Sequence, residues 1–218
     1  MKIWTSGTVE QVIQDSKTGL VDAIVTNPTV IADWCQTGSS LEVLAKKVTE
    51  ETNLPLYIQL KGPSYSDYLR QFDCLQGVSD KIIPKLPSTF DGIQAAKKLE
   101  ELGIETLVTT VCSLGQAYAC ASSDVTTICP YYNRLQESGE DAGTFLQNIS
   151  SIYSANGVKT KIIPASIRTL QDIEQALKNG SHGVIIFSKL FRELCDHPVT
   201  NSSIQGFDKD WEKIDRGF

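Results

Sequence analysis

A lysine in an apolar segment is the residue of this sequence that most directly indicates chemistry. Lys85 lies in the segment Lys81-Ile-Ile-Pro-Lys-Leu86, which is typical of a strand that ends in a turn at Pro87. One interpretation is a solvated strand end. The other is a buried amine, whose pKa would be lowered by burial among Ile82, Ile83 and Leu86 and by the nearby charges of Arg134 and Arg168. A deprotonated lysine attacks carbonyl carbons and forms a Schiff base.

Other apolar segments of the chain are also followed by polar residues. If these segments are parallel strands of one barrel, their carboxyl ends meet at one face, where such barrels carry their chemistry. Together the polar residues would form a bowl around Lys85. They are Ser6, Asn27, Gln59, Thr109, Tyr131, Arg134, Ser166, Arg168 and Ser188.

The residues that could move protons at this face are few. His182 precedes the last strand, His197 lies in a late loop, and the acidic residues fall mainly in helices and turns. Proton transfer is therefore expected from Tyr131, from the lysine itself, or from a water held between Gln59, Thr109 and Tyr131. The sequence predicts no metal site and no cofactor. Imidazoles and carboxylates, the usual ligands of a catalytic metal ion, are missing from that face.

Two arginines are candidate phosphate ligands. Arg134 follows the sixth strand, and Arg168 follows the seventh in Ser166-Ile-Arg168, just before a helix start. Helix N-termini bind phosphate through their N–H groups, and arginine matches phosphate oxygens with two donors. A surface ion pair is the alternative for each arginine.

The elements that must position these residues alternate along the chain. Helices are expected at Phe90–Leu102, after a cap at Ser88 or Thr89, and at Leu170–Leu177, after the capping box of Thr169 and Asp172. The expected strands are Lys2–Thr5, Val21–Thr26, Pro55–Leu60, Lys81–Leu86, Glu105–Val111, Val125–Pro130, Lys159–Ala165 and Gly183–Phe187.

Eight such units in 218 residues predict an α/β protein, a single-domain (β/α)8 TIM barrel with an extra C-terminal helix. An open doubly wound sheet is the alternative, but no G-x-G-x-x-G or P-loop follows any strand. The expected boundaries are 1–200 for the barrel and 201–218 for a helical tail. Phe207, Trp211 and Ile214 would share one face of the tail and pack on a neighbouring subunit.

Composition excludes several classes of protein. The net charge of −6 and the absence of a basic stripe argue against nucleic acid as a partner. No apolar run reaches the length of a membrane helix. The six cysteines form no C-x-x-C, and no secretion signal precedes them, so reduced thiols and a cytoplasmic location are expected.

Six short motifs, in order, resemble the transaldolase superfamily, and most closely its short fructose-6-phosphate aldolase-like branch. The resemblance runs over essentially the whole chain. The motifs are VTNPT at 25–29, YIQL at 57–60, KLP at 85–87, GQAYACA at 115–121, CPYYNR at 129–134 and ASIR at 165–168.

The resemblance implies a (β/α)8 barrel whose Schiff-base lysine is Lys85. It implies that Asn27 orients the donor and that Thr109 helps to hold a catalytic water. It also implies that a phosphate of the acceptor is held by Arg134, Ser166 and Arg168. A ring of five subunits, or two stacked rings forming a decamer, is implied as well.

Two positions distinguish branches of the superfamily, and one departs from it. True transaldolases carry glutamate and phenylalanine where this chain has Gln59 and Tyr131, which match the aldolase branch. The family has an aspartate at the end of the first strand, where this chain has Ser6. That exchange puts donor preference and rate in question.

The sequence thus predicts a class I aldolase. It would act on a ketose phosphate such as fructose 6-phosphate, joining or separating a C3 ketol and glyceraldehyde 3-phosphate. One alternative is a transaldolase that transfers a dihydroxyacetone unit between sugar phosphates. Another alternative is a sugar-phosphate-binding protein with weakened catalysis, because Ser6 stands where the family has its aspartate.

Overall fold

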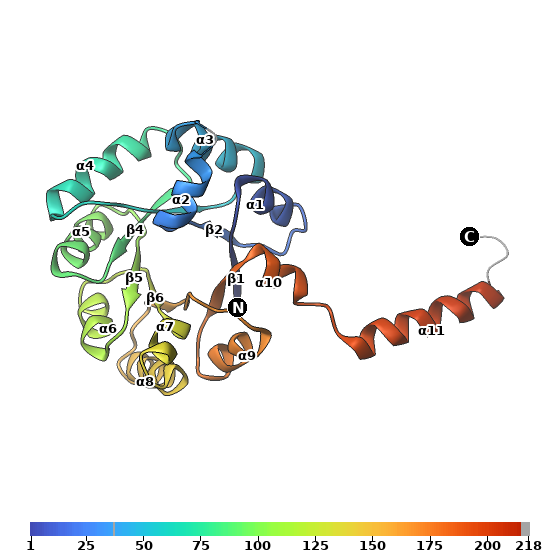
Figure 1. The fold of residues 1–218 in the computed structure, drawn as a ribbon. Helices are drawn as coiled ribbons and strands as arrows, with labels where there is room; N and C mark the ends of the chain where they lie inside the picture. The colour runs from blue at the N-terminus through green and yellow to red at the C-terminus, as the bar shows by residue number, and fades with distance from the viewer. Residues whose placement is uncertain (37, 215–218) are drawn as a thin grey trace.

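Eight parallel strands form one sheet in the computed structural model, which describes residues 1–36 and 38–214. The sheet order is β7-β6-β5-β4-β3-β2-β1-β8, and the ribbon closes on itself (Figure 1). The strands are β1 Lys2–Ser6, β2 Ala23–Val25, β3 Leu56–Gln59, β4 Ile82–Pro87, β5 Leu107–Val111, β6 Thr127–Pro130, β7 Lys161–Ile162 and β8 Gly183–Phe187.

Hydrogen bonds between β8 and the β7 segment complete the barrel. The backbone N–H of His182 donates to the carbonyl of Ile162 at 2.8 Å, and that of Ile185 donates to Pro164 at 2.9 Å. The Nδ1 of His182 accepts the N–H of Ile162 at 3.0 Å, at the amino end of both strands. His182 therefore belongs to the closure of the barrel and lies at the end opposite to Lys85.

Helices surround the barrel as expected. Thr89, rather than Ser88, caps α5, and Thr169 with Asp172 forms the capping box of α9. The helices are α1 Val9–Ser16, α2 Pro28–Cys35, α3 Leu41–Thr52, α4 Tyr65–Gln76, α5 Phe90–Glu101, α6 Leu114–Ala121, α7 Tyr132–Glu137, α8 Ala142–Ala155, α9 Leu170–Lys178, α10 Ser188–Glu193 and α11 Pro198–Ile214. The predicted (β/α)8 barrel with an extra C-terminal helix is confirmed.

Alternation along the strands separates two apolar cores. Outward side chains such as Ile58 and Leu86 pack in the large core under the helices. Inward side chains fill the barrel, where the rings of Trp4 and Tyr57 stack at 4.5 Å between centroids. Because this interior is packed, chemistry is confined to the rim at the carboxyl ends of the strands.

Pro84 is compatible with its position inside strand β4. The carbonyl of Lys85 accepts the N–H of Leu60, just after β3, so the neighbouring backbone groups of Pro84 face the β5 side. The pairing of β4 with β5 begins only at Lys85 opposite Leu107. The missing N–H of Pro84 therefore removes no hydrogen bond from the sheet.

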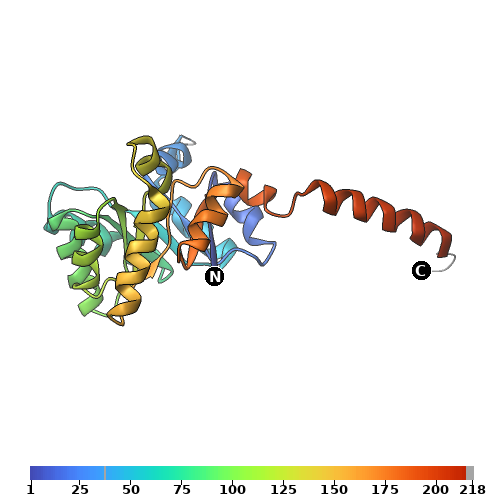
Figure 2. The ribbon, with the colours of Figure 1, turned by 90° about the horizontal axis from the view of Figure 1, so that it is seen from below.

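The last helix, α11, extends away from the barrel (Figures 1 and 2). None of its residues is buried, and its exposed apolar side chains include Ile204, Phe207 and Ile214. It begins at Pro198, close to the expected boundary at residue 200, and residues 215–218 of the expected tail lie outside the described part of the chain. Its packing on a second subunit stays a prediction. No helix in the described part of the chain has the length and hydropathy needed to span a membrane.

Candidate active site

Lys85 points into the barrel near the carboxyl end of β4. It is only 3% exposed, and its Nζ donates a hydrogen bond of 2.8 Å to the carbonyl of Thr26 at the end of β2. Among the described residues no carboxylate pairs with it. Burial lowers the pKa of Lys85 below its ordinary value, and the buried Cys129 thiol has a smaller, opposite effect.

The cause of the lowered pKa of Lys85 differs in part from the expected one. Ile82 and Leu86 point outward into the helical core, so they do not bury Lys85 as expected. Ile83 does pack in the barrel interior, and this interior buries the lysine. Arg134 and Arg168 are not among the causes of the lowered pKa, so the expected contribution of arginine charge was wrong.

A cavity of about 290 Å³ opens above Lys85 at the carboxyl end of the barrel. None of the described residues that line it carries a carboxylate or an imidazole. It brings together seven of the ten predicted residues, Lys85 included, from five strands and the loops that follow them: Ser6, Asn27, Lys85, Tyr131, Arg134, Ser166 and Arg168.

The other three predicted residues do not line this cavity. Ser188 is buried at the start of α10, and Gln59 and Thr109 lie beside the cavity. Gln59 is paired in register with Lys85 across β3 and β4, and Thr109 is inward on β5. Gln59 Oε1 and Thr109 Oγ1 are both buried, and neither has a hydrogen-bond partner of regular geometry among the described residues. These are polar atoms that a small ligand such as water can satisfy.

Tyr131 follows β6 and is half-buried beside Thr109. Burial raises the pKa of its phenol above the ordinary value, while the nearby Thr109 hydroxyl and Arg134 oppose this shift. The guanidinium of Arg134 lies over the Tyr131 ring, 5.3 Å from its centroid. The phenol is therefore protonated at neutral pH and can donate a proton.

Ser166 and Arg168 lie on the loop between β7 and α9. Ser166 adopts a left-handed backbone, with φ of 61°, and the Asn133 side chain donates to its carbonyl at 2.8 Å. Such a conformation in a serine costs about 1–3 kcal/mol and is most often found at functional sites. Arg168 is exposed and forms an ion pair with Glu137.

Part of the backbone before α9 is used within the chain. The backbone N–H groups of Arg168 and Thr169 donate to Asp172 Oδ2 at 3.1 and 3.0 Å. These two donors are therefore not free for a phosphate. The side chains of Ser166 and Arg168, which line the cavity, stay the predicted phosphate ligands of this loop.

Asn27 caps the start of α2 and also lines the cavity. Its Oδ1 caps the helix by accepting the N–H of Val30 at 2.9 Å. Its amide nitrogen has no hydrogen-bond partner in the described part of the chain, and the residue lines the cavity. The cap thus fixes the side chain in one orientation.

Two cavity neighbours were missed by the sequence analysis. Phe187 lines the cavity beside Ser6, its partner in the pairing of β1 with β8, and is 51% exposed. Its position as the last residue of a strand was a usable signal, but it follows four apolar residues and reads as core. Cys129 lies inside the barrel, where its thiol is close enough to influence the pKa of Lys85.

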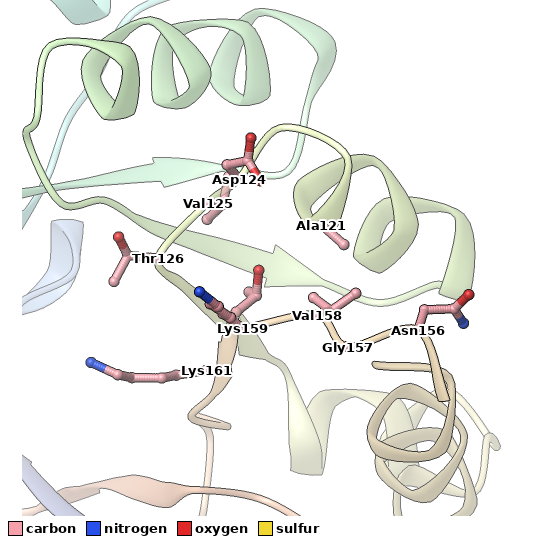
Figure 3. Close-up of a pocket in the computed structure, with 10 residues that line it drawn as sticks. Ala121, Asp124, Val125, Thr126, Asn156, Gly157, Val158, Lys159 and Lys161 are labelled. Carbon is pink, nitrogen blue, oxygen red and sulfur yellow. The ribbon is translucent and has the colours of Figure 1, made fainter. Parts of the chain in front are cut away.

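A second cavity, of about 550 Å³, lies at the other end of the barrel. It is formed by the turns that precede β6 and β7, and carries Lys159, Lys161 and Asp124 (Figure 3). Both lysines are exposed. Without a buried lysine, and at the amino ends of the strands, this cavity lacks the features that mark the site around Lys85.

Comparison with known proteins gives a consistent result. The model of a family described as transaldolase/fructose-6-phosphate aldolase matches residues 6–217. A probable transaldolase 2 of Listeria monocytogenes is 31% identical over 207 residues, which cover 95% of this chain and 94% of the relative. A probable transaldolase of Bartonella henselae is 31% identical over 209 residues, with the same coverage. One of Carboxydothermus hydrogenoformans is 30% identical over 208 residues, covering 95% and 96%.

Proposed function

The chain belongs to the transaldolase/fructose-6-phosphate aldolase family, and from that premise we propose that it is a Schiff-base aldolase acting on a ketose phosphate. The family makes it an enzyme, an aldolase or a transaldolase. We further propose that its substrate is of the fructose 6-phosphate type, which yields a C3 ketol and glyceraldehyde 3-phosphate. Lys85, Tyr131, Gln59 and Thr109 would carry out the catalysis. The substrate would be bound by Asn27, Ser6, Arg134, Ser166 and Arg168.

One observation carries the proposal: the burial of Lys85 without a countercharge. An ordinary lysine, with a pKa of about 10.4, has roughly one molecule in two thousand deprotonated at pH 7. Burial lowers the pKa of Lys85, and among the described residues its Nζ donates to a neutral carbonyl, that of Thr26. A larger share of the amine is therefore free to act as a nucleophile.

In the proposed reaction the Lys85 amine attacks the ketone carbon of the substrate. Loss of water leaves an iminium ion, which accepts electrons from the adjacent carbon–carbon bond. That bond breaks as the neighbouring hydroxyl loses its proton, so an aldehyde leaves and an enamine remains. Protonation of the enamine carbon and hydrolysis by water then release the ketol and restore the amine. Tyr131, with a water held by Gln59 and Thr109, would relay these protons.

Substrate binding is assigned to the rest of the rim. Asn27 and Ser6 would hold the donor hydroxyls near Lys85. Arg134, Ser166 and Arg168 would hold the phosphate of the acceptor. Arg168 must exchange its exposed pairing with Glu137 for this contact, which costs little because such pairs contribute about 0–1 kcal/mol.

A second candidate is transfer of the C3 unit to another aldehyde. The names of the relatives, probable transaldolases, favour it. Both candidates use Lys85 and differ in the fate of the enamine. Tyr131 lines the same cavity as Lys85, and its protonated phenol would favour release of the ketol.

The test of the proposal is chemical trapping. Enzyme is incubated with dihydroxyacetone and borohydride, digested, and examined by mass spectrometry. We expect the mass of the reduced C3 adduct on the peptide that contains Lys85, and none in Lys85→Met. An adduct on another lysine, such as Lys61, or no adduct at all, would refute the assignment.

A further inference from the structure

A hydrogen-bonded pair outside the cavity connects the strands that carry the reacting groups. Ser88, just beyond β4, is buried, and Thr110 lies within β5. The Ser88 hydroxyl donates to the carbonyl of Thr110 at 2.8 Å and lies 3.1 Å from its hydroxyl. The N–H of Ser88 donates to Thr110 Oγ1 at 3.1 Å and to the carbonyl of Thr109 at 2.9 Å.

Thr110 has an unusual backbone, and these bonds hold it. Its φ is 62°, a left-handed conformation that is a genuine outlier for a β-branched residue. At this point the pairing of β5 with β6 slips, from Thr109 opposite Cys129 to Val111 opposite Pro130. Thr110 is therefore the extra residue of a β-bulge, and bulges next to active sites redirect side chains.

The bulge changes the face on which the next side chain lies. In a regular strand Leu107, Thr109 and Val111 would all point inward. Here Leu107 belongs to the barrel interior, whereas Val111 packs in the outer core. Thr109 keeps its inward place close to the Tyr131 phenol. The Val111 carbonyl accepts the N–H of Tyr131 at 3.1 Å.

We infer that Ser88 and Thr110 are positioning residues for proton transfer at Lys85. Their mutual hydrogen bonds hold the β5 bulge that sets Thr109 and Tyr131 opposite the lysine. The inference rests on the proposed function. Lys85 itself is placed independently, because its carbonyl bonds to Leu60 and its Nζ to Thr26. The pair therefore acts on proton transfer and leaves formation of the Schiff base intact.

The decisive variant is Thr110→Val. Valine has the same branched shape, so the backbone strain of residue 110 is retained while the hydroxyl contacts with Ser88 are lost. Displacement of reacting groups by about 1 Å can cost on the order of a hundredfold in rate. We expect kcat for release of ketol from fructose 6-phosphate to fall about tenfold to a hundredfold. Borohydride trapping of dihydroxyacetone on Lys85 and the KM for the sugar should stay within about twofold.

Controls separate positioning from loss of stability. Thr110→Ser keeps the hydroxyl and should restore kcat to within about threefold of the unaltered protein. Thr126→Val removes a similar hydroxyl bond, of 2.8 Å to Glu100, at the opposite end of the barrel. It should lower the melting temperature and leave kcat unchanged.

The outcomes are distinguishable. If the unaltered protein gives no adduct on Lys85, the proposed function itself fails. If it gives the adduct and turns over, but a folded Thr110→Val has normal kcat, or loses trapping as much as kcat, the positioning role is refuted. Should Thr110→Val not fold, Ser88→Ala takes its place, since it keeps the backbone N–H bonds. A normal kcat in folded Ser88→Ala would then be the refuting result.

Discussion

Replacing Tyr131 by phenylalanine tests whether the phenol is the group that lets the donor fragment leave Lys85. The substitution deletes one oxygen atom. The ring remains for the guanidinium of Arg134, which lies 5.3 Å from its centroid. The backbone bonds of residue 131, including the bond from its N–H to the Val111 carbonyl, are unchanged. Folding and phosphate binding should therefore be preserved while the proton donor is lost.

The magnitude follows from the protonation state of the phenol. Burial raises the pKa of Tyr131 above that of a free tyrosine, so the group is fully protonated at neutral pH and loses nothing to ionisation. Loss of a positioned general acid or base costs about 10²–10⁴ in rate. That is about 3–5 kcal/mol in the activation barrier at 1.36 kcal/mol per tenfold. We expect this loss in ketol release, and a much smaller change in trapped Schiff base.

The assay has two steps. Enzyme is first incubated with fructose 6-phosphate alone and glyceraldehyde 3-phosphate is measured. Erythrose 4-phosphate is then added and sedoheptulose 7-phosphate is measured. Turnover in the first step, sharply reduced in Tyr131→Phe, supports the aldolase. Turnover of the unaltered protein only in the second step would show a transaldolase, and an unaffected Tyr131→Phe would refute the role of the phenol.

Three further predictions concern charge, phosphate and assembly. Lys85→Met should abolish turnover yet raise stability at neutral pH. The folded-state pKa of Lys85 lies below its ordinary 10.5, so the unaltered protein gains stability as pH rises between these two values. The advantage of methionine, about 1.4 kcal/mol per unit of lowering, should therefore shrink towards pH 10.5 in urea titrations; a constant advantage would contradict the burial argument. Arg134→Ala should raise KM for phosphorylated aldehydes about tenfold to a hundredfold, the value of a charge-assisted bond of about 1.5–3 kcal/mol, and equal effects on unphosphorylated aldehydes would argue against a phosphate contact. Ending the chain after His197 should reduce the particle mass in sedimentation; a monomeric full-length protein would show that α11 does not join subunits.

The fold was largely predictable because its signals are local. Each strand is an apolar run between turn residues, and the observed bounds differ from the expected ones by only a few residues at the ends. The helix starts at Thr89 and Thr169 were predictable because threonine is a favoured capping residue where a helix begins. The polar residues at the strand ends could be collected because parallel strands bring those ends together.

Features that depend on contacts between strands could not be predicted from the sequence. The bulge at Thr110 arises from a slip in pairing with β6, and nothing in the Thr109-Thr110 dipeptide announces it. The use of the Arg168 and Thr169 N–H groups within the chain depends on the direction taken by the Asp172 side chain. The burial of Lys85 was predicted, but two of its three expected neighbours, Ile82 and Leu86, point to the other side of the strand, and only Ile83 packs in the barrel interior.

The pairing of the first strand with the last has a consequence for synthesis of the chain. β1 comprises Lys2–Ser6, and its pairing partner on one side is β8, Gly183–Phe187. During vectorial translation the first strand is made long before the last, so one edge of β1 stays unpaired until nearly the whole chain has left the ribosome. Such edges pair readily with other chains. Nascent chains arrested before residue 183 should therefore be sensitive to protease and prone to associate, and those arrested after β8 has emerged should become resistant in one step.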